Sequence, residues 1–292
     1  MRLAGALVAA LVLLTSARPA AQLTDTASLL AAASRWTARF EQSLSNLLFH
    51  EQYRQTITNT GMLEQQVALP VGVHRYVEGN RGSLLTQANV FLLKPAGATR
   101  FVVYRDVYVA NGEKITDHTS RLQDLLVADT AAGRAQAQAL TDESARFNVG
   151  IIGRNTNIPT MVYDYLMPAN IGGIRVRPAG RQVLDGRELA VLEFQEIARP
   201  TLIRGPEGSD VPASGQYWID PSSGVVPRAV LHLEVGPYQA RTEVTLELHP
   251  LLKVWVPREM LEVWQAGSSR INGMARYDNF VRLAVSTEEI VK

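Results

Sequence analysis

The sequence predicts an α+β fold in which helices cover one face of a curved antiparallel sheet. Helix-like and strand-like periodicities occur in separate blocks, in the order helix, strands, helices and many strands. This segregation is typical of α+β domains. Many of the predicted strands after residue 171 also alternate apolar and polar residues, which indicates a sheet with one wet face and one covered face.

The first predicted helix begins after the N-cap candidates Thr24, Asp25 and Thr26. Its apolar residues recur at steps of three and four, which define one face of a helix; they are Leu29, Ala33, Trp36, Phe40, Leu44 and Leu47. The period then changes to two, because Phe49, Tyr53 and Ile57 alternate with polar residues, and this predicts a strand.

Helical sequence returns in the middle of the chain. We expect helices at Ser120–Val127, Ala131–Asn148 and Thr160–Leu166, between the two blocks of strands. Residues 61–80 have no clear periodicity, and we make no prediction there.

Two dipeptides that favour positive φ, Asn111-Gly112 and Asp185-Gly186, predict tight hairpins. Asn272-Gly273 is ambiguous because Gly267-Ser268-Ser269 is a competing turn. The expected strands are Val90–Leu93, Arg100–Val109, Gly172–Arg177, Arg181–Leu184, Glu188–Ile197, Gly215–Asp220, Val225–Val235, Gln239–His249, Val254–Trp264 and Ile271–Val285.

The clearest pattern runs from Val225 to His249, on both sides of Gly236-Pro237. If Val235 pairs with Tyr238, apolar residues face apolar residues along the whole hairpin, and polar residues face polar ones. We therefore expect this register in an antiparallel sheet.

Composition excludes several classes of protein. Of the 292 residues 46% are hydrophobic and 20% are charged, with 29 Lys and Arg, 28 Asp and Glu, and no cysteine. A chain without cysteine cannot use thiolate catalysis, Cys-ligated zinc or iron–sulfur clusters. The near-neutral charge argues against nucleic acid as a partner, because a polyanion requires clustered basic charge.

The first 21 residues have the layout of a secretory signal peptide. Arg2 gives a positive start, residues 3–14 are apolar or Gly, and a small mixed segment follows. The apolar stretch is shorter than the roughly 20 residues that span a bilayer; the alternative is a buried N-terminal helix. We expect residues 22–292 to form one domain that does not span a membrane and is periplasmic or secreted.

Several local motifs resemble the bacterial LolA-like superfamily, which includes the periplasmic lipoprotein carrier, its outer-membrane receptor and the sensor domain of an anti-sigma-factor regulator. The residues that carry the resemblance are Gly215–Arg228, with an aromatic-Trp-Ile-Asp-Pro strand end and a turn through Gly224, together with Glu143–Asn148 and Ala275–Phe280. The resemblance implies a half-barrel of about eleven strands with a helical lid over an apolar concave face. No functional residue carries over, since the carrier's cavity arginine has no match here.

The Trp218–Arg228 turn has two interpretations: a ligand mouth, or an ordinary turn that Asp220 caps and Gly224 closes with positive φ. We favour the second. The loop Ala198–Ser214 is expected to be an exposed connection and could serve as a flap for partner docking.

An apolar concave face is the default ligand site of such a fold. Core packing is the ordinary role of its tryptophans, and ligand contact is the alternative. The candidate ligand-binding residues are Trp36, Phe194, Trp218, Leu231, Leu233, Leu246, Leu248, Trp255 and Trp264. Arg146, Arg154 and Asn155 lie where the lid would meet the sheet, and they either orient a head group or cap helix ends.

No reactive motif is present. The five histidines form no His-x-x-x-His pair, and no Gly-x-Ser-x-Gly string marks a nucleophile elbow. His232 and His249 lie beside Glu234 and Glu247 on the expected wet face, where solvated side chains are favoured over a metal site. We therefore expect no enzymatic activity, no metal and no cofactor.

The sequence thus favours a non-enzymatic periplasmic binding protein that holds a lipid, an acyl chain or a lipidated partner on its concave face. The alternative is an envelope interaction or sensor domain whose concave face is filled by its own side chains. A hydrolase whose site is assembled from distant residues stays open.

Overall fold

The structure is a computed structural model that describes residues 25–45, 47–58, 81–93, 102–116, 133–149, 154, 157–205 and 208–283. The predicted signal peptide, the predicted helix Ser120–Val127 and Asn155 lie outside these residues. Within the described part, none of the helices has the length and apolar composition of a transmembrane span.

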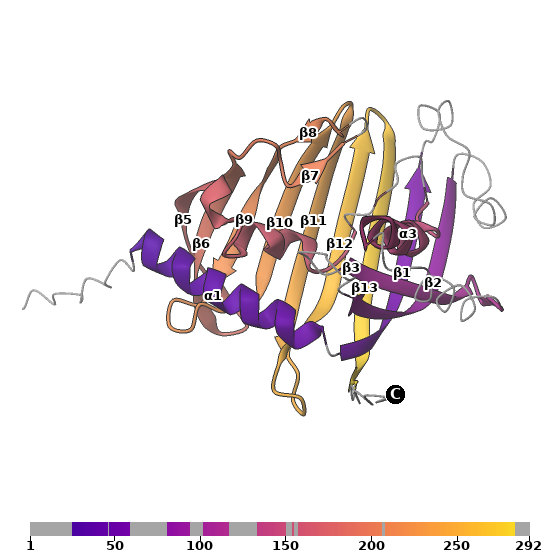
Figure 1. The fold of residues 1–292 in the computed structure, drawn as a ribbon, viewed down its shortest axis with the longest axis horizontal. Coiled ribbons are helices and arrows are strands. Elements are labelled where there is room, and N and C mark those ends of the chain that lie inside the picture. Colours follow the sequence, from indigo (N-terminus) through magenta and orange to yellow (C-terminus); the bar gives the residue numbers. More distant parts are fainter. Residues whose placement is uncertain are drawn as a thin grey trace, which may run out of the picture.

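Eleven strands form one open antiparallel sheet in the order β4-β3-β2-β1-β13-β12-β11-β10-β9-β6-β5 (Figure 1). The strands are β1 (Leu47–Thr58), β2 (Arg81–Leu93), β3 (Val102–Ala110), β4 (Glu113–Lys114), β5 (Ile174–Leu184), β6 (Arg187–Glu196), β9 (Ala213–Ile219), β10 (Arg228–Val235), β11 (Tyr238–Leu248), β12 (Trp255–Ala266) and β13 (Ser269–Arg282). Two short strands, β7 (Ile203–Arg204) and β8 (Asp210–Val211), form a separate small sheet.

The sheet joins distant parts of the chain at its centre. β1 pairs with β13, so residues near 50 lie beside residues near 277. From this seam the strands run outward in sequence order, to β4 on one side and back to β5 on the other. The predicted α+β half-barrel of about eleven strands is confirmed.

The helices lie on one face of this sheet, which we call the inner face (Figure 1). They are α1 (Thr26–Leu44), α3 (Gly133–Ala145) and two 3-10 helices, η2 (Met161–Leu166) and η3 (Ile171–Gly173). The side chain of Asp25 caps α1 by accepting from the Ser28 N–H. The apolar stripe of α1 is buried from Leu29 to Leu44 as predicted, but Leu47, the last residue of the predicted stripe, begins β1.

The hairpin predictions are confirmed. Val235 pairs with Tyr238, and the register places Leu231 and Leu233 in the core and His232 at the surface. Asn111, Gly112, Asp185 and Gly186 all have positive φ. The β12–β13 turn is at Gly267-Ser268, and Asn272-Gly273 lies inside β13, which resolves the ambiguity.

Three elements differ from the prediction. Gly172–Arg177 and Arg181–Leu184 belong to one strand, β5, which continues through an irregularity between Pro178 and Arg181. β2 begins nine residues before Val90, at Arg81. The helix after Thr160 is a 3-10 helix that ends at Leu166; Met167, which precedes a proline, has ψ 142°, because the following ring disfavours helical backbone.

Candidate functional site

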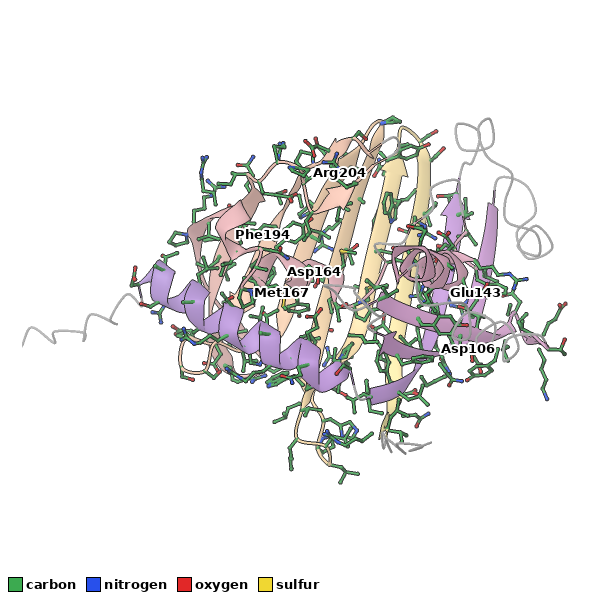
Figure 2. The ribbon with its side chains drawn as sticks, in the orientation of Figure 1. Asp106, Glu143, Asp164, Met167, Phe194 and Arg204 are labelled. Atoms are coloured by element: carbon green, nitrogen blue, oxygen red, sulfur yellow. The ribbon has the colours of Figure 1, made fainter. Side chains whose placement is uncertain are left out.

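The inner face is divided into an apolar half and a polar half. The apolar half lies beneath α1 and η2, over strands β6, β9, β10 and β11. The polar half lies beneath α3 and the segment that follows it, over β1, β3, β12 and β13. Figure 2 shows Phe194 and Met167 near α1, and Glu143 near α3 on the other side.

Aromatic rings form the centre of the apolar half. Trp36 and Phe40 of α1 stack with centroids 5.0 Å apart, and both contact the edge of Tyr163 in η2. On the sheet side, Phe194 lies 4.8 Å from Tyr217. These rings fill the space between helix and sheet.

The tyrosine hydroxyls of the apolar half bond to backbone. Tyr217 donates to the carbonyl of Val162 at 2.8 Å, and Tyr163 donates to the carbonyl of Val226 at 3.2 Å. Burial raises the pKa of both phenols well above the usual value. These groups therefore stay neutral and attach η2 firmly to the sheet.

Six of the nine candidate ligand-binding residues belong to the buried core of the inner face, five of them in the apolar half and Trp264 on β12 beside Glu262. Each has at most 6% of its surface exposed; they are Trp36, Phe194, Leu231, Leu233, Leu246 and Trp264. Trp255 is partly buried at the border of the core, with the guanidinium of Arg187 over its ring at 5.3 Å. Their contact with a ligand stays a prediction.

Two candidates lie elsewhere. Leu248 is 51% exposed at the end of β11. Trp218 is buried, but on the opposite, outer face of the sheet, where it packs against Leu189, Val191 and Val230. The expected place of Trp218 on the inner face was wrong, because Tyr217, its neighbour in the strand, takes the inward position.

Hydrogen bonding also fixes Trp218 on the outer face. Its indole N–H donates to Oε1 of Gln182, and the guanidinium of Arg228 lies 4.4 Å from its ring centroid. The following turn is capped as expected: Asp220 Oδ1 accepts from the Ser222 N–H at 2.8 Å, and Gly224 has φ +74°.

The polar half contains two fully buried ion pairs. Arg105 of β3 binds Glu51 of β1 in a bidentate manner, with Nε–Oε1 at 2.5 Å and Nη2–Oε2 at 3.0 Å. The guanidinium also donates to the carbonyls of Ser144 and Asn157. Arg105 therefore ties α3 and the segment after it to the sheet.

Arg154 forms the second pair, with Glu262 of β12; both side chains are 0% exposed. Its guanidinium also donates to the Val149 carbonyl at 2.9 Å and to Oε1 of Gln55. Glu262 accepts further bonds from the hydroxyl of Tyr53 and from the indole of Trp264. Among the three guanidinium nitrogens of Arg154, only Nε is buried without a hydrogen-bond partner.

Asn148 and Asn157 complete this network through reciprocal amide bonds. We call the whole group the buried polar cluster: Glu51, Tyr53, Gln55, Arg105, Asn148, Arg154, Asn157 and Glu262. Burial, together with the charge of Glu262, raises the pKa of Tyr53. Burial lowers the pKa of Arg105, but the adjacent Glu51 outweighs this and raises it, so Arg105 stays charged.

The predicted lid residues have different positions. Arg154 is at the centre of the buried polar cluster, at the junction of lid and sheet where we expected it. Arg146 is half-buried, 3.6 Å from Glu143 and 5.5 Å from the ring centroid of Phe147. The loop Ala198–Ser214 includes β7 and β8, and the buried carboxylate of Glu196 accepts from the Leu202 and Ala213 N–H groups.

Sequence reasoning missed Glu51, Gln55, Arg105 and Glu262. A signal was present for two of them, because Glu51 and Gln55 share the strand face of Phe49, Tyr53 and Ile57. The residues described contain no group of three His, Asp or Glu side chains placed to hold a metal ion. His232 and Glu234 are exposed and His249 is half-buried, as the one-wet-face pattern predicts.

No protein-family model matches the chain, and no curated protein matches it in sequence. Solved structures resemble it in general architecture. A DUF1329 family protein from Desulfovibrio piger has 9% identity and a TM-score of 0.36, over 87% of this chain and 92% of that one.

A protein described as an outer membrane lipoprotein-sorting domain, from Vibrio parahaemolyticus, has 11% identity and a TM-score of 0.34, over 87% and 91% of the two chains. The lipoprotein LppX of Mycobacterium tuberculosis has 11% identity and a TM-score of 0.25, over 89% and 98%. At these identities and TM-scores the likeness is confined to general architecture and says nothing about ligand or activity.

Proposed function

We propose that the protein is a non-enzymatic binding protein of the bacterial cell envelope. Its ligand is the acyl chain of a lipid or of a lipidated protein, held in the apolar half of the inner face beneath α1. The signal-like pattern of residues 1–21 supports export. In this proposal α1, and not the predicted mid-chain lid, is the helix that moves aside for the ligand.

One observation carries the proposal: α1 covers the apolar half with a stripe of apolar side chains. The stripe consists of Leu29, Ala33, Trp36, Phe40 and Leu44, and the only polar residues buried with it are Ser34 and Thr37. The hydroxyl of Thr37 is buried without a hydrogen-bond partner. An acyl chain offers the sheet the same kind of surface that this stripe offers.

The energies of the two occupants are comparable. Four large side chains of the stripe contribute roughly 8–10 kcal/mol at about 2–2.5 kcal/mol each. An acyl chain with about 15 buried methylenes contributes about 12 kcal/mol at about 0.8 kcal/mol per methylene. Exchange of the stripe for an acyl chain is therefore close to balanced, and α1 can yield to a ligand.

The C-terminal end of α1 limits how it can move. The helix ends at Leu44 and β1 begins at Leu47, so the link is very short. Displacement of α1 would thus pivot at this link, with the largest motion at Asp25 and the first turn.

A second candidate function rests on the packing of the inner face. The described side chains fill the apolar half with aromatic rings and the polar half with ion pairs. A domain with a filled interior suits protein docking or sensing through its outer surfaces, without an internal ligand.

Thermal shift with palmitate and with phosphatidylglycerol vesicles distinguishes the two candidates. We expect a rise in Tm on ligand addition, and native mass spectrometry of protein prepared from a bacterial periplasm should show added lipid mass. A bare mass, together with no rise in Tm for either ligand, would remove the first candidate and favour the second.

Two tryptophan variants make this test specific to the inner face. Trp36→Ala removes part of the competing stripe, so it should lower the Tm of the free protein but enlarge the shift caused by palmitate. The matched control is Trp218→Ala, whose ring is also 6% exposed but lies on the outer face. It should lower the Tm without enlarging the palmitate shift.

A further inference from the structure

The outer face of the sheet carries a groove near its β5 edge that the proposed acyl site does not use. The groove has a volume of about 590 Å³ and crosses four adjacent strands, β5, β6, β9 and β10. Charged and polar side chains of these strands line it together with some apolar surface, whereas the other face of the same strands carries Phe194, Tyr217 and Leu231 in the core.

Four of its side chains form one row across the strands. Arg175 pairs in register with Gln195, Gln195 with Ser214, and Ser214 with His232. Neighbouring strands lie about 4.8 Å apart, so the row extends over roughly 14 Å. All four side chains are exposed, and none makes a hydrogen bond or ion pair within the described structure.

Arg175 differs from the other arginines of this surface because its charge has no carboxylate partner among the described residues. Three other arginines on the outer face of β5, β10 and β11 pair with glutamates: Arg177 with Glu193, and Arg228 and Arg241 with Glu243. Glu193 is occupied by Arg177 and by the amide of Gln216. Arg175 is thus a cation that no carboxylate of the described residues neutralises.

The opposite end of the row is uncharged at neutral pH. Partial desolvation of the ring and the guanidinium of Arg241 both lower the pKa of His232. The row therefore offers one positive charge beside the edge, followed by three neutral groups that can donate hydrogen bonds.

The backbone next to Arg175 is also unpaired. β5 is the last strand of the sheet, and among the described residues nothing pairs with its outer edge. Exposed edges accept an added strand from another chain, whose main-chain groups give affinity and whose alternate side chains give specificity. A lipid head group or a free phosphate could use Arg175, but only a peptide could use the edge as well.

We propose that the edge formed by Ile174–Arg177 and the adjacent groove bind an extended acidic segment of a partner protein. The segment adds a strand to β5 and places an Asp or Glu side chain on Arg175, within reach of Gln195. Opposite charges directly across neighbouring strands attract. The groove is on the other face from the proposed acyl site, so the two proposals stand or fall separately.

Fluorescence anisotropy with two labelled probes tests this proposal on the full chain. The probes are Ac-Thr-Val-Glu-Val-Thr-Val-NH2 and the same peptide with Lys in place of Glu. We expect the Glu peptide to bind about tenfold more tightly, since the Lys peptide repels Arg175. Arg175→Glu should reverse this preference, and the matched variant Arg181→Glu, on the same strand, should leave it unchanged.

Equal affinity for the two peptides, or a preference that survives Arg175→Glu, would overturn the proposal. Inorganic phosphate and phosphatidylglycerol vesicles are the further arms. Binding of either that depends on Arg175, without binding of the Glu peptide, would identify an anion site and overturn the peptide assignment. Arg175 is exposed, so circular dichroism should show an unchanged fold in the variants.

Discussion

The buried ion pair between Arg154 and Glu262 should dominate the stability of the polar half. Both side chains are fully buried, and Glu262 accepts from Arg154, Tyr53 and Trp264. Glu262→Gln keeps the shape but removes the charge, and it places an amide donor against groups that are themselves donors. Breaking a buried pair in this way costs about 3–5 kcal/mol, because the remaining charge is uncompensated.

This loss can be measured by urea unfolding followed by circular dichroism. For a domain of this size about 1 kcal/mol corresponds to roughly 2–4 °C in Tm, so a loss of about 4 kcal/mol should lower the Tm by roughly 8–16 °C. The control is Glu188→Gln, which breaks the exposed pair with Arg181, where Glu188 is 56% exposed. That change should cost at most about 1 kcal/mol.

A double-mutant cycle separates the pair from general damage to the core. Arg154→Met alone leaves the buried carboxylate of Glu262 without its cation and should be as harmful as Glu262→Gln. The free energy of unfolding that the double variant loses should be smaller than the sum of the two single losses by at least about 2 kcal/mol. The reason is that neither buried charge remains in the double variant. Additive losses, or a Glu262→Gln effect no larger than that of Glu188→Gln, would refute the reasoning.

Three further predictions concern α1 and the outer face. Gly224→Ala should displace α1 and raise the hydrogen-exchange rate of its amides, because Gly224 has φ +74° and a Cβ there would lie 2.7 Å from the backbone of Ala32. The control is Gly236→Ala, at φ +58° with open space around the Cβ, which should leave α1 protected. By NMR, His232 should titrate below about 6.5, the usual value, and Arg241→Gln should raise its pKa towards that value. Burial raises the pKa of Asp220, but bonds from Ser222 and Ser223 outweigh this and lower it. The stabilising effect of Asp220 is therefore present above about pH 3.9 and lost as the pH falls further, so the Tm difference between wild type and Asp220→Asn should vanish in acid.

The sequence was sufficient for the sheet wherever alternation was clear. In β10 and β11 only two residues break the alternation, Val230 on the outer face and Thr242 on the inner face, and Gly236-Pro237 marks the turn, so one register fits both strands best. In β2 the inward residues include Thr86 and Ala88, which give little hydrophobic contrast. The first half of that strand therefore had no visible period.

The buried polar cluster could not be predicted from the sequence, for a different reason. Alternation alone places Glu51 and Gln55 on the inner face of β1, but a charge on a buried face makes physical sense only with its partner. The partners are distant in the chain: Arg105 is 54 residues from Glu51, and Glu262 is 108 residues from Arg154. Only the strand order, with β1 between β2 and β13, brings these groups together.

The two halves of the inner face differ in how their helices can leave the sheet. Moving α3, Arg154 and Asn157 off the sheet would separate Arg154 from Glu262 and take the carbonyls of Ser144 and Asn157 away from Arg105. Each of the two separated charges carries a penalty of several kcal/mol, whereas the pair between Arg105 and Glu51 joins two strands and stays together. The buried stripe of α1 exposes apolar groups when it leaves, and an apolar ligand can cover the sheet in its place. Of these two movements, the proposed opening at α1 is the one that a lipid would compensate, while the pair between Arg154 and Glu262 holds the polar half closed.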